Sequence, residues 1–163
     1  TLLKALAACE TKHAAAAILG GGPQVEGLRE LAGTLGLGDR VVFLDPVPKG
    51  QVMDFLRRMD IAYMGLRPLP IYEAGVSLTK LNDYMLAERP ILGAVEGADD
   101  AISDAQGGIV CPPEDVPAVA RAIDAFAGMS VDELATMGRN GRKWVAENRD
   151  YRVLAARFLD GLV

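Results

Sequence analysis

The feature that most constrains the fold is a regular alternation of short apolar runs with longer segments of helical periodicity. Five runs of four to six residues are almost entirely apolar, and each is followed within two residues by glycine or proline. Short apolar runs bounded by turn residues are typical of strands that are buried on both faces of a parallel sheet. We therefore expect strands at residues 15–19, 41–44, 61–66, 91–95 and 108–111.

Between these runs, apolar residues recur at intervals of three and four, as on one face of a helix. Helices are expected at residues 25–35, 51–59, 77–87 and 116–126, and the tail at residues 130–163 is expected to be helical throughout. Gly36 stands where a left-handed residue ends a helix, and Ser77 and the acidic pair at 114–115 suit helix N-termini. Ser130 and Glu133 form a capping-box sequence. The pattern predicts a doubly wound α/β domain, with a parallel sheet between helices and a helical C-terminal tail.

The beginning of the chain departs from this alternation. Leu2, Leu3, Leu6 and Ala7 predict a helix with no strand before it. The length of 163 residues corresponds to a single domain, which we place at residues 1–163. The expectation is that the first strand of this domain lies upstream of Thr1 and has been cut away.

Composition and charge exclude several classes of protein. Lys and Arg number 17 and Asp and Glu 22, so the chain lacks the basic surplus of a nucleic-acid-binding protein. No apolar stretch approaches the roughly 20 residues that span a bilayer, and the N-terminus does not resemble a signal peptide. Cys9 and Cys111 give no disulfide framework or zinc-site spacing, which fits a reducing cytoplasm. His13 is the single histidine, so a nucleophilic triad is not expected.

A glycine-rich turn is the first candidate for binding a ligand. Gly20, Gly21, Gly22 and Pro23 follow a predicted strand and precede a predicted helix. Residues without side chains at such a place let a phosphate approach backbone N–H groups. The turn lacks the spacing of a dinucleotide fingerprint or a P-loop. The alternative is that these glycines only form a tight turn.

A second candidate lies on the predicted helix at residues 77–87. Lys80 and Asp83 are three residues apart, and Ser77 is near the helix N-terminus. One helix face would then offer a cation to a diphosphate and a carboxylate to two ribose hydroxyls. The alternative is a surface ion pair of Lys80 with Asp83, worth about 0.2–0.5 kcal/mol.

Taken together, these segments resemble the C-terminal domain of the retaining GT-B glycosyltransferases of group 1, also called family four. The resemblance covers roughly residues 2–123. It rests on the order and spacing of Gly20-Gly21-Gly22-Pro23, residues 38–44, Val47-Pro48, Asp60-Ile61, residues 75–77 with 80–85, and Pro90-Ile91.

The resemblance implies one Rossmann-like half of a GT-B fold, whose N-terminal acceptor-binding domain is missing here. It also implies that the glycine turn faces the diphosphate of a nucleotide sugar and that residues 46–48 meet the nucleobase. Asp83 would hold the ribose. The family more often has Glu at this position and a second Glu at the position of Gly75. Glu73, two residues earlier, is the predicted substitute in this chain.

The predicted function is donor binding in the transfer of a sugar from a nucleoside diphosphate to a hydroxyl acceptor, in surface-polysaccharide or glycolipid synthesis. Catalytic roles are assigned to Lys80 and Glu73, and no metal or other cofactor is required. The expected location is the cytoplasm, with peripheral contact at the inner membrane face through the rest of the protein left open. The predicted substrate-binding residues are Gly20, Gly21, Gly22, Pro23, Val47, Pro48, Gly75, Val76, Ser77, Leu81 and Asp83.

Two other functions stay open at this stage. A nucleotide-sugar epimerase shares the GT-B architecture, but it needs acid and base groups, and Glu73 and Asp83 are the carboxylates that the predicted site offers. The other is a non-catalytic α/β binding or regulatory module.

The last helical segment carries a basic cluster. A solvated helix face is the favoured interpretation, and contact with anionic lipid headgroups or with the missing domain is the alternative. The cluster consists of Arg139, Arg142, Lys143, Arg149, Arg152 and Arg157.

Overall fold

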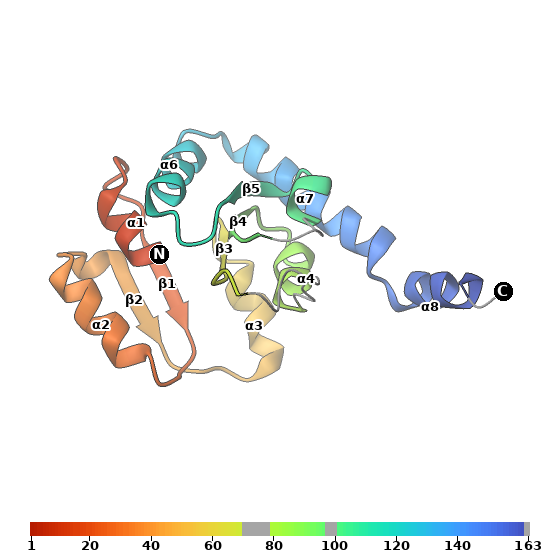
Figure 1. Ribbon diagram of the computed structural model, residues 1–163, viewed down its shortest axis with the longest axis horizontal. Coiled ribbons are helices and arrows are strands. Elements are labelled where there is room, and N and C mark those ends of the chain that lie inside the picture. Colours follow the sequence, from red (N-terminus) through yellow and green to blue (C-terminus); the bar gives the residue numbers. More distant parts are fainter. Residues whose placement is uncertain (70–78, 97–100, 162–163) are drawn as a thin grey trace.

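The computed structural model describes residues 1–69, 79–96 and 101–161, in which helices alternate with strands (Figure 1). The elements are α1 (Leu2–Ala8), β1 (Ala16–Leu19), α2 (Val25–Thr34), the short 3-10 helix η1 (Gly38–Arg40), β2 (Val41–Leu44), α3 (Lys49–Leu56), β3 (Ala62–Gly65), α4 (Thr79–Leu86), β4 (Ile91–Ala94), α5 (Ala101–Asp104), β5 (Gly108–Cys111), α6 (Val116–Ala127), α7 (Val131–Asn148) and α8 (Tyr151–Asp160).

All five expected strands are present, and every strand pair is parallel. They form two hydrogen-bonded sheets, one with the order β1-β2 and one with the order β3-β4-β5. Ala16 of β1 is in register with Val41 of β2, and Ala62 of β3 is in register with Ile91 of β4. The α/β class with parallel strands and covering helices is confirmed.

One hydrophobic core cluster underlies both sheets. It contains Leu6 of α1, Val41 of β2, Leu92 of β4 and Phe126 of α6. Helices α1 and α6 pack against each other over this core. A second core cluster, which includes Met64, lies between α4, α5, α7 and the three-stranded sheet. The packing therefore joins the two sheets although they share no hydrogen bonds in the described part of the chain.

The expectation that every strand is buried on both faces is wrong for the two-stranded sheet. All four residues of β4 are buried. In β2, by contrast, Val42 is 48% exposed and Leu44 38% exposed. Alternate residues of a strand point to opposite faces, and only the face with Val41 and Phe43 packs on the core.

Local capping signals are confirmed where the structure describes them. Gly36 has φ +65°, a left-handed conformation that suits glycine after the end of α2. The Asp115 side chain accepts a hydrogen bond from the Ala118 N–H at 2.8 Å and so caps α6. Ser130 and Glu133 form both bonds of the capping box at the start of α7.

The expected helical C-terminal tail is confirmed, and it consists of two helices, α7 and α8. The backbone leaves the helical conformation at Arg149, with φ −123° and ψ 2°. Asp150 then starts α8 by accepting a hydrogen bond from the Arg152 N–H at 2.8 Å. Helix α8 extends away from the body of the molecule (Figure 1), and none of its ten residues is buried. None of the helices in the described residues is long and apolar enough to cross a membrane.

Candidate functional site

The glycine turn lies at the carboxyl end of β1, before α2. Gly20 has φ +115°, which an L side chain rarely adopts, and its N–H donates to the Leu44 carbonyl at 3.0 Å. Gly21, Gly22 and Pro23 are all exposed. Backbone without side chains is thus presented to solvent immediately before a helix, as an anion-binding turn requires.

The loop that follows β2 lies against this turn. A Cβ built at Gly21 would be 3.7 Å from Cγ of Pro46, an ordinary contact distance. Val47 is half-buried, and Pro48 is exposed and stands before the first residue of α3. The predicted diphosphate-binding turn and the predicted base-binding loop are therefore neighbours at the carboxyl ends of paired strands. In doubly wound folds this edge of the sheet is where ligands bind.

Helix α4 presents the second group of predicted site residues. Lys80 and Asp83 are both exposed. Within the described residues, no ion pair or hydrogen bond joins Lys80 to Asp83, so the surface-pair alternative is not what the structure shows. Leu81 is 6% exposed and packs in the core cluster with Met64 and Met85. Its side chain therefore serves packing, and the polar face of α4 is left to Lys80 and Asp83.

Four predicted site residues precede α4 in the chain. Glu73, Gly75, Val76 and Ser77 lie outside the described residues. The site is therefore described at the glycine turn, the loop after β2 and helix α4.

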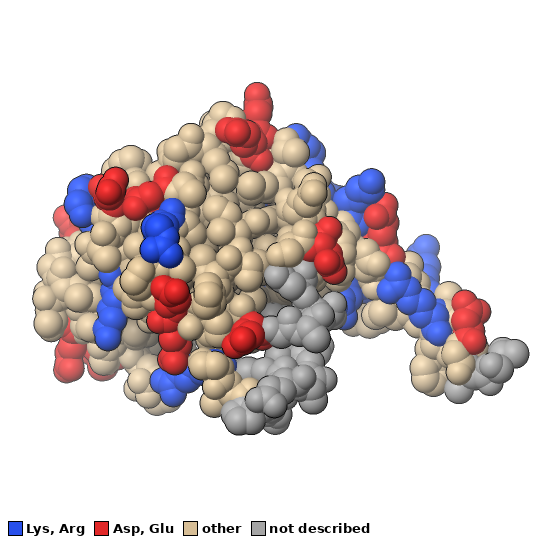
Figure 2. Space-filling view, turned by 45° about the horizontal axis from the view of Figure 1, so that its top comes forward, with Lys and Arg blue, Asp and Glu red and all other residues tan. Residues whose placement is uncertain are grey.

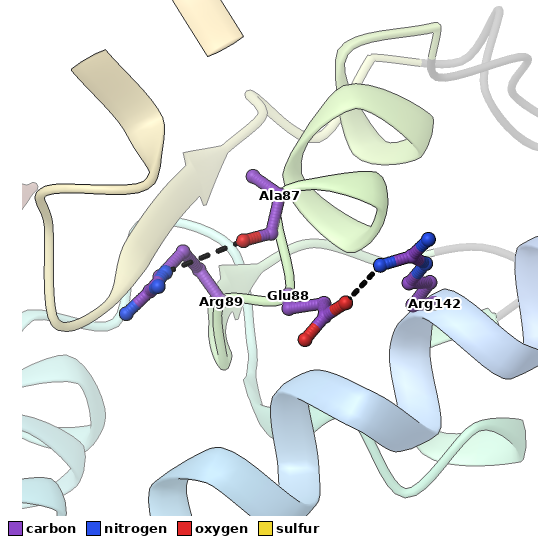
Figure 3. A network of polar contacts seen from close by, with 4 residues as sticks. All are labelled: Ala87, Glu88, Arg89 and Arg142. Carbon is purple, nitrogen blue, oxygen red and sulfur yellow. Dashed lines mark hydrogen bonds and ion pairs between the residues drawn. The ribbon is translucent and has the colours of Figure 1, made fainter. Parts of the chain in front are cut away.

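The C-terminal end of α4 is anchored to α7 (Figure 3). Glu88 has the left-handed φ of 57°, and its carboxylate pairs with the guanidinium of Arg142 on α7. A Cβ at Gly138 would collide with the carbonyl oxygen of Glu88, and a Cβ at Gly141 would lie 3.3 Å from Cγ of Met85. This contact between α4 and α7 is not among those expected from the sequence. Its signal is the pair of glycines three residues apart within a helix, which lets another backbone approach closely.

Next to Asp83 on α4, the Tyr84 side chain is an uncharged group. Burial raises the pKa of the Tyr84 phenol, and the Asp83 carboxylate beside it raises it further, so Tyr84 is neutral at pH 7. In the part of the chain that the structure describes, no group of three or more His, Cys, Asp or Glu side chains could hold a metal ion. The described site thus offers an ammonium, a carboxylate and backbone N–H groups.

Comparison with known proteins identifies related sequences. The family model described as "Glycosyl transferases group 1" matches residues 1–144. The GDP-mannose-dependent alpha-(1-6)-phosphatidylinositol monomannoside mannosyltransferase of Mycolicibacterium smegmatis is 29% identical over 149 residues. That alignment covers 90% of this chain and 38% of the relative, so the chain spans about two fifths of the relative's length.

Solved structures share the fold. Alr3699/HepE of Anabaena, in a complex with UDP-glucose, superposes with a TM-score of 0.78 at 21% identity, over 99% of this chain and 43% of that one. The C-terminal domain of a group 1 glycosyl transferase family protein, LpcC of Francisella tularensis, has a TM-score of 0.72 at 15% identity. This match covers 92% of this chain and 78% of the solved domain.

Proposed function

The chain belongs to the group 1 glycosyl transferases, and from this premise we propose that it binds the nucleoside diphosphate sugar from which a sugar is transferred to a hydroxyl acceptor. The observation that carries the proposal is on α4. There Lys80 and Asp83 share an exposed helix face without pairing to each other. A cation and a carboxylate held in this way suit a ligand that has both a diphosphate and ribose hydroxyls.

We assign the leaving-group chemistry to Lys80 and the glycine turn. As the bond from the sugar to the diphosphate breaks, negative charge grows on the diphosphate while an oxocarbenium-like centre forms on the sugar. The Lys80 ammonium and the N–H groups at Gly20–Gly22 would stabilise that charge more in the transition state than in the ground state. This requires no metal ion. Retention of configuration at the sugar, and a contact of Glu73 with that sugar, belong to the same proposal.

We assign recognition of the nucleoside to two other parts. Asp83 would accept hydrogen bonds from the two ribose hydroxyls, and residues 46–48 would contact the base through backbone groups. The backbone of residues 75–77 would complete the diphosphate site. The proximity of Gly21 to Pro46 supports these assignments, because the diphosphate and the base of one nucleotide must be bound by neighbouring segments.

The acceptor is expected to be bound by another part of a longer protein. The mycobacterial relative is named for a phosphatidylinositol monomannoside, which is a lipid, and this supports glycolipid synthesis for our protein. Because this chain matches only 38% of that relative, we expect it alone to bind the donor without transferring the sugar.

Calorimetric titration with UDP, GDP and dTDP, and with the corresponding nucleosides, tests the donor site. Lys80→Gln should weaken binding of the preferred nucleoside diphosphate roughly five- to thirtyfold at low salt and leave nucleoside binding unchanged. The loss should shrink as ionic strength rises, because an exposed ion pair is screened. Asp83→Ala should weaken nucleoside and nucleoside diphosphate alike, by about 1–3 kcal/mol.

The matched control is Lys143→Gln on α7, which removes the same charge from an exposed helix position and leaves Glu147 without the partner it has at 3.9 Å. It should change neither affinity. If Lys80→Gln behaves like Lys143→Gln at low salt, Lys80 is only a solvated helix residue and the donor-site assignment is wrong.

A further inference from the structure

The Tyr63 side chain lies along strand β3 and reaches toward the carboxyl end of that strand. A Cβ built at Gly65, the last residue of β3, would be 2.5 Å from the Tyr63 hydroxyl oxygen and 2.9 Å from Cζ of the ring. The hydroxyl therefore occupies the space that a side chain at position 65 would fill. Gly65 is in register with Ala94, and Ala94 with Cys111, which are the last residues of β4 and β5. The Tyr63 hydroxyl thus lies at the carboxyl edge of the three-stranded sheet.

The hydroxyl of Tyr63 has no hydrogen-bond partner in the part of the chain that the structure describes. These same residues contain no buried side-chain nitrogen or oxygen atom without a partner, so the hydroxyl is in contact with solvent. The residue as a whole is half-buried, because its ring packs against the core cluster that holds Leu6 and Phe126. A ring that is fixed by packing therefore presents a free hydrogen-bonding group at the sheet edge where ligands bind.

The Tyr63 phenol is uncharged at neutral pH. Burial of the ring raises the pKa of Tyr63 above its ordinary value of 10.0, and the nearby Cys111 thiol raises it further. A neutral phenol keeps its proton and can donate a hydrogen bond to an anion. Lys80, by contrast, attracts an anion through its charge. Salt screens the attraction between charges, so the contributions of the two side chains can be separated by their dependence on ionic strength.

Strand β3 lies between the two parts of the proposed diphosphate site (Figure 1). On one face of β3, Tyr63 packs against the same core cluster as Ile18 of β1, which is two residues before the glycine turn. On the other face, Met64 packs in one cluster with Leu81 of α4, the neighbour of Lys80. The Tyr63 hydroxyl is therefore at the sheet edge between the glycine turn and the helix that carries Lys80.

We propose, on the premise of the donor site described above, that Tyr63 is a third group that binds the diphosphate of the donor. Its hydroxyl donates a hydrogen bond to a diphosphate oxygen, between the N–H groups of the glycine turn and the Lys80 ammonium. A nucleoside without phosphates does not reach Tyr63. Gly65 is part of the same arrangement, because a side chain at that position would displace the hydroxyl.

The experiment is calorimetric titration of the full 163-residue chain with UDP, GDP and dTDP and with the corresponding nucleosides. Tyr63→Phe removes only the hydroxyl. It should weaken binding of the preferred nucleoside diphosphate roughly tenfold and leave nucleoside binding unchanged. The loss should persist at high ionic strength, whereas the loss caused by Lys80→Gln should shrink.

Gly65→Ala is the second variant, because it keeps the Tyr63 hydroxyl but displaces it. It should weaken binding of the nucleoside diphosphate by a similar factor. When it is combined with Tyr63→Phe, it should add little further loss, since both changes remove the same hydrogen bond. The matched control is Tyr84→Phe, which removes the hydroxyl of another half-buried tyrosine and should leave the affinity for the nucleoside diphosphate unchanged.

The outcomes distinguish this inference from the proposed function. If Lys80→Gln weakens binding and Tyr63→Phe does not, the donor site stands, and Tyr63 is only a packing residue. A Tyr63→Phe loss that shrinks with salt, or an equal loss in Tyr84→Phe, would also overturn the inference. Fully additive losses in the double variant would overturn the role of Gly65. If the native chain binds none of the three nucleoside diphosphates, the proposed function fails and this inference fails with it.

Discussion

At two glycines inside helices, Gly138 and Gly33, adding a side chain should have opposite effects on the stability of the protein. A Cβ at Gly138 in α7 would collide with the carbonyl oxygen of Glu88, whereas a Cβ at Gly33 in α2 would meet nothing within 4 Å. Gly138→Ala should therefore destabilise the protein by about 1–3 kcal/mol, through the shift that it forces on α4. Gly33→Ala should stabilise it by about 0.5–1 kcal/mol, because alanine favours the helix. Chemical denaturation of both variants measures the difference.

The ion pair of Arg142 with Glu88 lies at the same contact, so the stability cost of removing it can be compared with that of Gly138→Ala. The side chains of Arg142 and Glu88 are 59% and 38% exposed, so Arg142→Ala should cost at most about 1 kcal/mol. If Gly138→Ala costs no more than Arg142→Ala, the close approach of α7 to α4 is not what holds this contact together.

Residues whose role is local could be predicted from the sequence, and residues whose role depends on a distant partner could not. Gly36, Asp115 and Ser130 act on backbone within a few positions, and their capping roles are confirmed. Gly138 is constrained by Glu88, 50 positions earlier, and the spacing of Gly138 and Gly141 indicates a close approach without identifying Glu88 as the partner. At the site, the spacing of Lys80 and Asp83 predicts a shared helix face but not whether the two pair.

At the scale of elements, α6 is fastened to the segment between α1 and β1 by one carboxylate. Asp124 accepts hydrogen bonds from the Glu10 N–H at 3.0 Å, the Thr11 N–H at 2.8 Å and the Thr11 hydroxyl at 2.7 Å. These bonds hold the pKa of Asp124 below its ordinary value of 3.8, and the bond from the Glu10 N–H has the largest effect. The carboxylate thus links two segments of the chain that are far apart in sequence.

The lowered pKa of Asp124 predicts a stability that depends on pH. The contribution of Asp124 is fully present above its ordinary pKa of 3.8 and is lost as the pH falls through the lower pKa of the folded state. Asp124→Asn should therefore lower the denaturation midpoint at pH 7, and the difference from the native chain should narrow below about pH 4. Thr11→Val, which removes one of the donors, should produce part of the loss. A difference that stays constant down to pH 2.5 would contradict this assignment.

The strands and the helical character of the tail could be predicted from the sequence, but the position at which the tail divides into α7 and α8 could not. Apolar runs bounded by glycine and proline mark strands locally, and β5 occupies the predicted residues 108–111. The interruption at Arg149 has no glycine or proline. Its signal is Asp150, which caps α8 and is one of many acidic residues that the sequence alone does not distinguish.

At the scale of the whole molecule, charge is divided between the body and the arm formed by α7 and α8. Residues 139–160 carry six Lys and Arg against three Asp and Glu, and the remaining residues carry 11 against 19. Lys and Arg side chains accordingly follow this arm in Figure 2. Several have partners on the arm itself, including Lys143 with Glu147 and Arg157 with Asn148. This agrees with the favoured interpretation of the basic cluster as a solvated helix face.

The arrangement of the strands in two sheets is also a property of the whole molecule. Each strand is marked by its own residues, but which strands become neighbours depends on the crossovers between them. The sequence pattern predicts one doubly wound sheet, and the described residues form two sheets that share a core.

Helix α8 should contribute almost nothing to the stability of the rest of the chain. None of its residues is buried, and Tyr151 and Phe158 are 89% and 68% exposed. A chain that ends at Arg149 should therefore unfold within a few degrees of the full chain, because little apolar surface is lost from the core. Leu6→Ala in the full chain is the comparison, since Leu6 is 2% exposed and its truncation should cost about 2–5 kcal/mol. Far-UV circular dichroism of the shortened chain should lose only the helix signal of α8. A fall in the unfolding temperature as large as that of Leu6→Ala would mean that α8 packs against the body in solution.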